Sequence, residues 1–153
     1  MDTNQPLLKS LGLADLLVSQ GFGVPNRAYK SRIHNGTDIA CPVGTPIFAP
    51  VDGVVIQTWH QHESMGNALL FRCELNGSHY EFRMLHLSYI LHAGSFAKGE
   101  VMALSGNTGF STGAHVHLEV WKGKYEPAVL LSKSEVLEHL VDVEELLITN
   151  PTC

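Results

Sequence analysis

The sequence contains few charged side chains and no strong excess of either sign. Of its 153 residues 16% are charged, and the formal net charge is −5 at pH 7. A protein that binds nucleic acid through the phosphates needs a basic surface, so this composition argues against a nucleic-acid partner. The apolar fraction of 44% is ordinary for a folded chain and excludes a disordered one.

Long apolar runs are also missing. No stretch approaches the ~20 apolar residues that a transmembrane helix requires, so no membrane partner is expected. The start of the chain, Met1 to Pro6, lacks the basic residues and the apolar run of a secretory signal peptide. We therefore expect synthesis in the cytoplasm, and action outside the cell would need another route.

Cysteine is scarce and odd in number, with Cys41, Cys73 and Cys153. These residues show no CxxC spacing, and a disulfide framework would require an even count in a shorter secreted chain. Free thiols in a reducing compartment are the simpler interpretation. The length suits a single domain with one buried core, and the chain shows no internal repeat or interdomain linker.

Hydrophobic periodicity predicts a helix near each end of the chain. Apolar residues at helical spacing predict one helix over 7–18 and another within 132–147, where Ser132 or Ser134 is available as the N-cap. We expect one domain over 1–153, with an N-terminal helical segment (1–20), a core (21–122) and a C-terminal helical tail (123–153).

The sequence pattern of the core (21–122) is typical of strands and turns. Short apolar and β-branched runs, bounded by glycine or proline, predict strands at 39–41, 46–50, 54–59, 67–75, 79–87, 101–104 and 115–121. The dipeptide Asn76-Gly77 predicts a tight hairpin between two of them. The expected fold class is therefore mostly β (α+β), with a single antiparallel β-sheet and short flanking helices.

Histidine is the residue in unusual supply, with nine copies. Five of these are expected to be scattered surface residues: His60, His62, His79, His92 and His139. The other four lie in ordered contexts and need an explanation: His34, His86, His115 and His117.

The motif His115-Val116-His117 places two imidazoles on one face of a predicted strand, about 6.6 Å apart along the backbone. One ring can then bind a metal while the other lies beside it. Taken alone, the pattern is more typical of solvent-facing polar residues, and His60-Gln61-His62 has the same spacing.

The segment from His34 to Asp38 offers an imidazole and a carboxylate. In a straight strand their backbones would lie roughly 13 Å apart, too far for one ion. Asn35-Gly36 can bend the chain, because both residues tolerate left-handed backbone angles. The alternative is that Asp38 caps a turn while His34 lies in solvent.

His86 lies at the end of an apolar strand, where a lone histidine is usually a buried core residue. The three segments together change that interpretation. Two neutral imidazoles and one carboxylate are the ligand set of a catalytic zinc site, which leaves one coordination position open.

At these residues the chain resembles the lysostaphin/LytM-type family of zinc endopeptidases, which cut peptides in bacterial peptidoglycan. The matching motifs appear in the family's order and cover roughly residues 21 to 122: 34–38, 46–53, 84–88 and 105–117. The resemblance implies that the core is the catalytic part and that its antiparallel sheet is of the lysostaphin/LytM type.

The resemblance also implies the roles of particular residues. One Zn²⁺ ion would be held by His34, Asp38 and His117. The unligated catalytic histidines would be His86 and His115. An upstream tyrosine helps to stabilise the transition state in the family, and Tyr29 is the nearest candidate. Because the stretches 60–66 and 105–113 are expected to wall a substrate groove, further candidates for substrate binding are Asn107, Thr108 and Ser111.

The implied function is a zinc-dependent endopeptidase that hydrolyses peptide cross-links of peptidoglycan, acting as a monomer on stem or cross-bridge peptides. The lack of an export signal favours a phage-type lysin that reaches the cell wall through a holin-made pore or within the virion. Glycine bridges and D-alanyl–diaminopimelate cross-links are both open as substrates, and the lack of a wall-targeting module favours the latter.

Two alternatives differ in class. A non-catalytic LytM-like regulator would activate other cell-wall hydrolases, and the presence of all three ligands and both flanking histidines argues against it. A structural zinc site, or a histidine-rich β domain without a ligand, explains each motif separately but not their combination.

Overall fold

A computed structural model describes residues 4–126 and 131–149 of the chain. Most of its regular structure is β, and every strand pairing among the described residues is antiparallel, which confirms the predicted fold class. No helix within these described ranges is long and apolar enough to cross a membrane.

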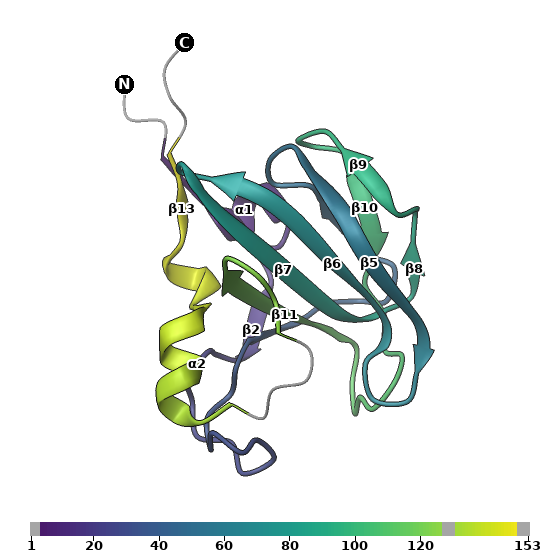
Figure 1. Cartoon of the computed structure of the whole chain (residues 1–153). Coiled ribbons are helices and arrows are strands. Elements are labelled where there is room, and N and C mark those ends of the chain that lie inside the picture. The colour runs from purple at the N-terminus through teal and green to yellow at the C-terminus, as the bar shows by residue number, and fades with distance from the viewer. Residues whose placement is uncertain (1–3, 127–130, 150–153) are drawn as a thin grey trace.

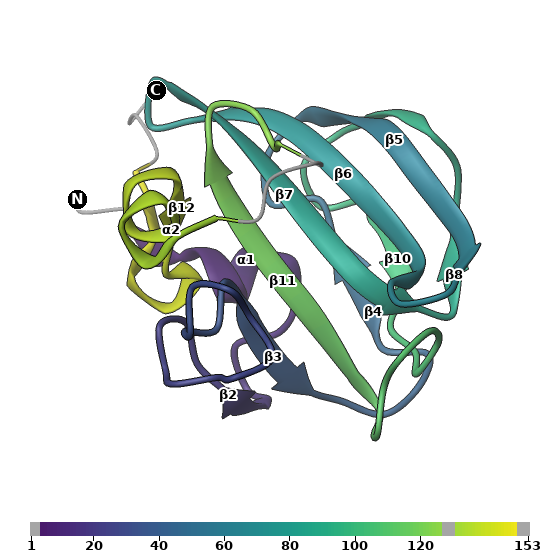
Figure 2. The same ribbon diagram turned by 60° about the horizontal axis from the view of Figure 1, so that its bottom comes forward.

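The main sheet has the strand order β2-β3-β11-β7-β6-β5-β9, and β12 also pairs with β11 (Figure 1). The bounds of its strands are β2 Leu17–Gln20, β3 Thr37–Ala40, β5 Gly53–His62, β6 Gly66–Leu75, β7 Ser78–Leu87, β9 Gly94–Phe96, β11 His115–Lys122 and β12 Leu140–Val141. Figure 2 shows β11 running between β3 and β7, so the HxH motif lies at the beginning of an interior strand of the sheet.

Two smaller sheets accompany the main one, whereas the sequence predicted a single sheet. The main sheet is the largest of the three. One has the order β4-β10-β8, and the other pairs β1 with β13. Their strands are β1 Gln5–Pro6, β4 Pro46–Phe48, β8 Tyr89–Ile90, β10 Val101–Leu104 and β13 Leu147–Ile148.

One face of the main sheet covers the hydrophobic core. Val116, Leu118 and Val120 on β11 are at most 1% exposed, as are Phe82 and Met84 on the neighbouring β7. Strand alternation then turns the intervening residues of both strands towards the opposite face. That opposite face carries the candidate site.

The hairpin predicted at Asn76-Gly77 is confirmed. It joins β6 to β7, with Leu75 paired to Ser78, and both turn residues have positive φ angles of 53° and 79°. These angles are typical of the two-residue turns that match the twist of antiparallel strands.

The predicted N-terminal helix is wrong beyond its first part. Helix α1 spans Leu7–Leu11 and ends at Gly12, whose φ is 83°, while Leu17–Gln20 forms the edge strand β2 on β3. A Cβ at Gly12 would lie 2.7 Å from the Phe48 ring, so this position needs glycine for space as well as for conformation. Sheet pairing therefore outweighs the helical spacing of Leu17 and Val18.

The predicted C-terminal helix begins where expected but is half as long. Helix α2 spans Lys133–His139, and Ser132 is its N-cap in a capping box with Glu135. Leu140–Val141 then joins the sheet as β12, and a 3-10 helix, η1, follows at Val143–Glu145. The helix stops because Leu140 and Val141 pair with β11.

Candidate metal centre

The pairing of β3 with β11 places the carboxylate of the site beside an imidazole. Asp38 and His117 are direct cross-strand partners, and His117 Nδ1 lies 2.8 Å from Asp38 Oδ1. The same alternation that buries Val116 turns His115 and His117 to one face of β11.

The third residue, His34, reaches this point through a turn before β3. His34 Nε2 lies 3.4 Å from Asp38 Oδ1, and its Nδ1 donates to the carbonyl of Gly21 at 3.1 Å. The turn passes so close to β11 that a Cβ at Gly36 would lie 2.7 Å from the Leu118 carbonyl and 2.8 Å from His117 Cε1. Gly36 is therefore required for close approach. Neither Asn35 nor Gly36 has a positive φ angle, so the left-handed bend that the sequence predicted there is wrong.

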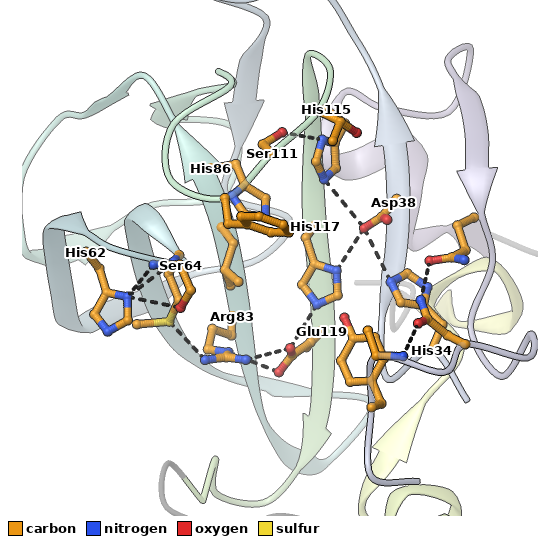
Figure 3. Close-up of a pocket in the computed structure, with 18 of the residues that line it drawn as sticks. His34, Asp38, His62, Ser64, Arg83, His86, Ser111, His115, His117 and Glu119 are labelled. Carbon is orange, nitrogen blue, oxygen red and sulfur yellow. Dashed lines mark hydrogen bonds and ion pairs between the residues drawn. The ribbon is translucent and has the colours of Figure 1, made fainter. Parts of the chain in front are cut away.

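One potential ligand atom from each of His34, Asp38 and His117 lies within 4.8 Å of the others (Figure 3). His34 and His117 are nearly fully buried, and Asp38 is half-buried. Two imidazole nitrogens and one carboxylate oxygen suit a borderline divalent ion such as zinc. The donor set thus fits the metal that the sequence predicts.

The catalytic candidates His86 and His115 lie next to this group, with their ring centroids 4.8 Å apart. His86 Nδ1 donates to the Thr108 carbonyl at 2.8 Å, and His115 Nδ1 donates to the Gly113 carbonyl at 2.7 Å. Because a carbonyl only accepts, the Nε2 atoms carry the lone pairs in the neutral rings. His115 Nε2 lies 3.8 Å from Asp38 Oδ1.

His86 reaches the site by breaking the alternation of β7. Phe82, Met84 and Leu87 are buried in the core, and regular alternation would direct His86 inward with Phe82 and Met84. Its φ of 67° lies in the left-handed region, and the register between β6 and β7 shifts opposite it. Such strain in a non-glycine residue is concentrated at functional sites.

Opposing charges set the protonation of the centre. Burial lowers the pKa of His117, but hydrogen bonds and charges from Asp38 and Glu119 outweigh it and raise the pKa to about 9. Burial likewise raises the pKa of Asp38, but hydrogen bonds from His117 and His34 hold it well below its ordinary value. A cation that binds at His117 Nδ1 must therefore displace a proton.

Burial is the main cause of the pKa shifts of His86 and Tyr29. Burial lowers the pKa of His86, and its hydrogen bond to Thr108 opposes this only in part. Burial raises the pKa of Tyr29, and the charges of Glu119 and Asp38 raise it further. His86 is thus kept as a neutral acceptor, and Tyr29 as a neutral hydrogen-bond donor.

The centre opens into a cleft of about 660 Å³. Tyr29 and Ser111 line it, and the Tyr29 ring centroid lies 5.7 Å from that of His34. Thr108 is not among the residues that line the cleft. It stabilises the cleft wall, because its hydroxyl donates to the Leu87 carbonyl and its own carbonyl accepts from His86. Asn107 is exposed in the same loop.

His62 was predicted to be a scattered surface residue. It is exposed, but it also lines the cleft, and its Nδ1 accepts from the amides of Ser64 and Met65 at 3.2 Å. Strand β5 extends three residues beyond its predicted end, which carries His62 to the cleft rim. The other four histidines expected at the surface are exposed or half-buried.

Glu119 and Arg83 are two further residues of the site, and no motif in the sequence singled them out. Both lie against the candidate metal centre, with Glu119 Oε2 2.9 Å from His117 Nε2 and 2.6 Å from Arg83 Nη2. A signal was available, because Glu119 and Trp121 continue the every-second-residue pattern of His115 and His117 along β11.

Comparison with known proteins places this centre in a family context. Residues 32–128 match the family model described as Peptidase family M23. The peptidoglycan DD-endopeptidase ShyA of Vibrio cholerae is 44% identical over 89 residues, which are 57% of this chain and 20% of that protein. The chain therefore spans about a fifth of the length of this relative.

Solved structures support the same relationship. A zinc-containing peptidase from Vibrio cholerae is 32% identical with a TM-score of 0.62, over 86% of this chain and 36% of the other. The catalytic domain of lysostaphin from Staphylococcus simulans gives a TM-score of 0.66 at 24% identity, over 87% and 92% of the two chains. At that identity the lysostaphin likeness shows the fold alone.

Proposed function

The chain belongs to peptidase family M23, and on that premise we propose that it is a zinc-dependent endopeptidase that hydrolyses peptide cross-links of bacterial peptidoglycan. The observation that carries this proposal is the convergence of His34, Asp38 and His117 at the floor of an open cleft. A structural zinc site would have a closed ligand shell instead.

The ligands proposed for zinc are His34 Nε2, Asp38 Oδ1 and His117 Nδ1. Zinc in such a site acts as a Lewis acid, which polarises a peptide carbonyl and lowers the pKa of water towards about 7. The ligand count argues against a non-catalytic regulator, because all three donors are in place.

His115 and His86 would manage protons beside the metal. Each ring directs its Nδ1 hydrogen to a backbone carbonyl, which leaves Nε2 as the acceptor. An acceptor in this position can take a proton from the attacking water and return it to the departing amine. The hydroxyl of Tyr29 stays protonated and can donate to a developing oxyanion at the cleft.

We propose the D-alanyl–diaminopimelate cross-link as the bond that is cut. Its support is the 44% identity over 89 residues to ShyA, which is named a peptidoglycan DD-endopeptidase. The cross-link joins two D-configured centres, whereas a glycine bridge has none. Action as a monomer and a phage-type setting stay predictions.

Hydrolysis of defined peptidoglycan tests the proposal. The purified protein with one equivalent of zinc is incubated with cross-linked sacculi that contain diaminopimelate and, separately, with sacculi cross-linked by glycine bridges. Mass spectrometry of the products identifies the new ends. We expect monomers from dimers in the first digest only, and loss of cleavage with a chelator. Intact dimers in both digests would contradict the proposed activity.

A further inference from the structure

Strand β11 carries a polar row that extends past the metal centre. His115, His117, Glu119 and Trp121 occupy alternate positions, while Val116, Leu118 and Val120 between them are buried in the core. The first two residues belong to the candidate centre already described. Glu119 has no role there, although it is 1% exposed and directly contacts a proposed ligand.

Every contact of the Glu119 carboxylate is with a donor. Oε2 accepts from His117 Nε2 at 2.9 Å and from Arg83 Nη2 at 2.6 Å. Oε1 accepts from Arg83 Nε at 3.0 Å and from Trp121 Nε1 at 2.9 Å. Because guanidinium and indole N–H groups cannot accept, they hold the carboxylate as an ionised acceptor in one orientation.

Both ring nitrogens of His117 face a carboxylate, Nε2 that of Glu119 and Nδ1 that of Asp38. When a cation takes the lone pair of Nδ1, the ring keeps one hydrogen, on Nε2, and the ionised Glu119 carboxylate accepts it. Nδ1 is the atom that lies 2.8 Å from Asp38 Oδ1, at the candidate metal position. A histidine with the opposite tautomer would present an N–H to a cation.

We propose that Glu119 is the positioning residue of the metal centre: clamped by Arg83 and Trp121, it fixes the tautomer and the ring orientation of His117 for metal binding. A ligating histidine whose second nitrogen donates to a carboxylate is also a more basic ligand. The inference rests on the proposed function, since it assigns Glu119 a role towards the same ion.

Arg83 makes the burial of this carboxylate possible. It is the direct cross-strand partner of Glu119 on β7, and its guanidinium neutralises the charge in a bidentate pair. Its remaining Nη1 group donates to the Tyr125 hydroxyl at 2.8 Å and contacts Met65 Sδ at 3.1 Å. The Arg83 guanidinium is thus fixed by Tyr125 and Met65, which line the cleft, as well as by Glu119.

The chain contains a matched control in Glu81. This carboxylate is 3% exposed and forms a cross-strand ion pair with Arg72 at 2.9 Å, between β6 and β7. Its other oxygen accepts from the backbone amide of Tyr125 at 2.7 Å. Glu81 therefore has the chemistry and burial of Glu119 without a histidine contact among its hydrogen bonds.

Zinc affinity of the full chain, measured by chelator competition, separates the two carboxylates. Glu119→Gln replaces an acceptor oxygen with an NH₂ group that must face two of the four donors. We expect it to weaken zinc binding about 10–100-fold. Glu81→Gln, which alters a similarly buried carboxylate whose partner Arg72 is exposed, should leave zinc affinity within about twofold of the parent protein. An equal loss in both variants, or no loss in Glu119→Gln, would overturn the proposal.

A measurement on the unmutated, zinc-loaded protein keeps the test independent of folding. Nitrogen-15 NMR should show His117 with its hydrogen on Nε2 and that hydrogen protected from exchange with water. A hydrogen on Nδ1, or a rapidly exchanging Nε2–H, would contradict the inference. If the parent protein itself binds no zinc, the proposed function fails, which is a different outcome from zinc binding that is indifferent to Glu119.

Discussion

The histidines of the centre differ in which ring nitrogen faces the candidate metal position. His34 presents Nε2, because its Nδ1 donates to the Gly21 carbonyl, whereas His117 presents Nδ1, because its Nε2 contacts Glu119. His86 and His115 present Nε2 beside them, with each Nδ1 on a backbone carbonyl. The backbone and one buried carboxylate thus assign distinct roles to chemically identical side chains.

Replacement of a proposed ligand should remove metal and activity together. His117→Ala deletes one of the three proposed ligands. It also removes the imidazole hydrogen bond to the buried Glu119 carboxylate. We expect less than one tenth of an equivalent of zinc after desalting and no measurable cleavage of cross-linked dimers. Elemental analysis and the sacculus digest measure the two quantities. A variant that kept zinc and activity would remove His117 from the ligand set.

Replacement of a flanking histidine should separate the two properties. His115→Ala leaves the three proposed ligands intact, so zinc content should stay at one equivalent. The cleavage rate should fall about 10²–10⁴-fold, the usual contribution of a general acid or base. His60→Ala, an exposed histidine on β5, is the control and should cleave at the parent rate. Normal hydrolysis by the His115 variant would show that this ring handles no proton.

At the scale of elements, the cleft wall depends on contact between two turns. The turn from β5 to β6 packs on the loop 105–113, where the Phe110 amide donates to the Ser64 carbonyl at 3.0 Å. The Asn67 amide donates to Thr108 Oγ1 at 3.0 Å, and Thr108 in turn holds His86. The two glycine-containing segments therefore position a catalytic candidate through backbone contacts.

A methyl group at Gly66 should disrupt this contact. A Cβ there would lie 2.2 Å from Thr108 Oγ1 and 2.5 Å from the Thr108 carbonyl carbon, so the loop must move. Gly66→Ala should lower cleavage at least tenfold while zinc content is retained. Gly77→Ala is a matched control, since its φ of 79° imposes similar strain with nothing within 4 Å of the new Cβ. Equal activity of the two variants would show that the wall does not position His86.

The elements differ in how far local sequence could predict them. The hairpin at Asn76-Gly77 and the N-cap at Ser132 follow from local conformational preference, and both are found in the structure. The two helices were predicted too long, because Leu17–Gln20 and Leu140–Val141 pair with distant strands instead. Non-local pairing of this kind has no signature in residue spacing.

The residues of the site also divide into those that local sequence could predict and those that depend on non-local strand pairing. The HxH spacing and the segment from His34 to Asp38 pointed to the residues that meet at Asp38. The reason given for Gly36 was incomplete, because its constraint is the close approach of β11 and not a left-handed backbone. The Arg83–Glu119 pair depends on the register between β7 and β11, which the sequence leaves undetermined. The turn of His86 towards the cleft depends on its left-handed backbone within a strand, and no glycine marks that position.

At the scale of the whole molecule, zinc binding and folding should be linked. The proposed ligands come from the turn before β3, from β3 and from β11, so the ligand set exists only in the folded chain. Zinc at about 100 times its dissociation constant should then stabilise the protein by about 2.7 kcal/mol. Calorimetry with and without a chelator measures the shift in melting temperature. His117→Ala should show no shift, and a shift equal to that of the parent would indicate zinc binding elsewhere.

The central claim is that two imidazoles and one carboxylate bind a single zinc ion with one position left open. X-ray absorption spectroscopy of the protein with one equivalent of zinc tests it most directly. We predict two imidazole nitrogens at about 2.0–2.1 Å and one carboxylate oxygen at about 2.0–2.2 Å, with a fourth, exchangeable ligand from solvent. A spectrum with sulfur ligands, or with fewer than two imidazoles, would contradict the account.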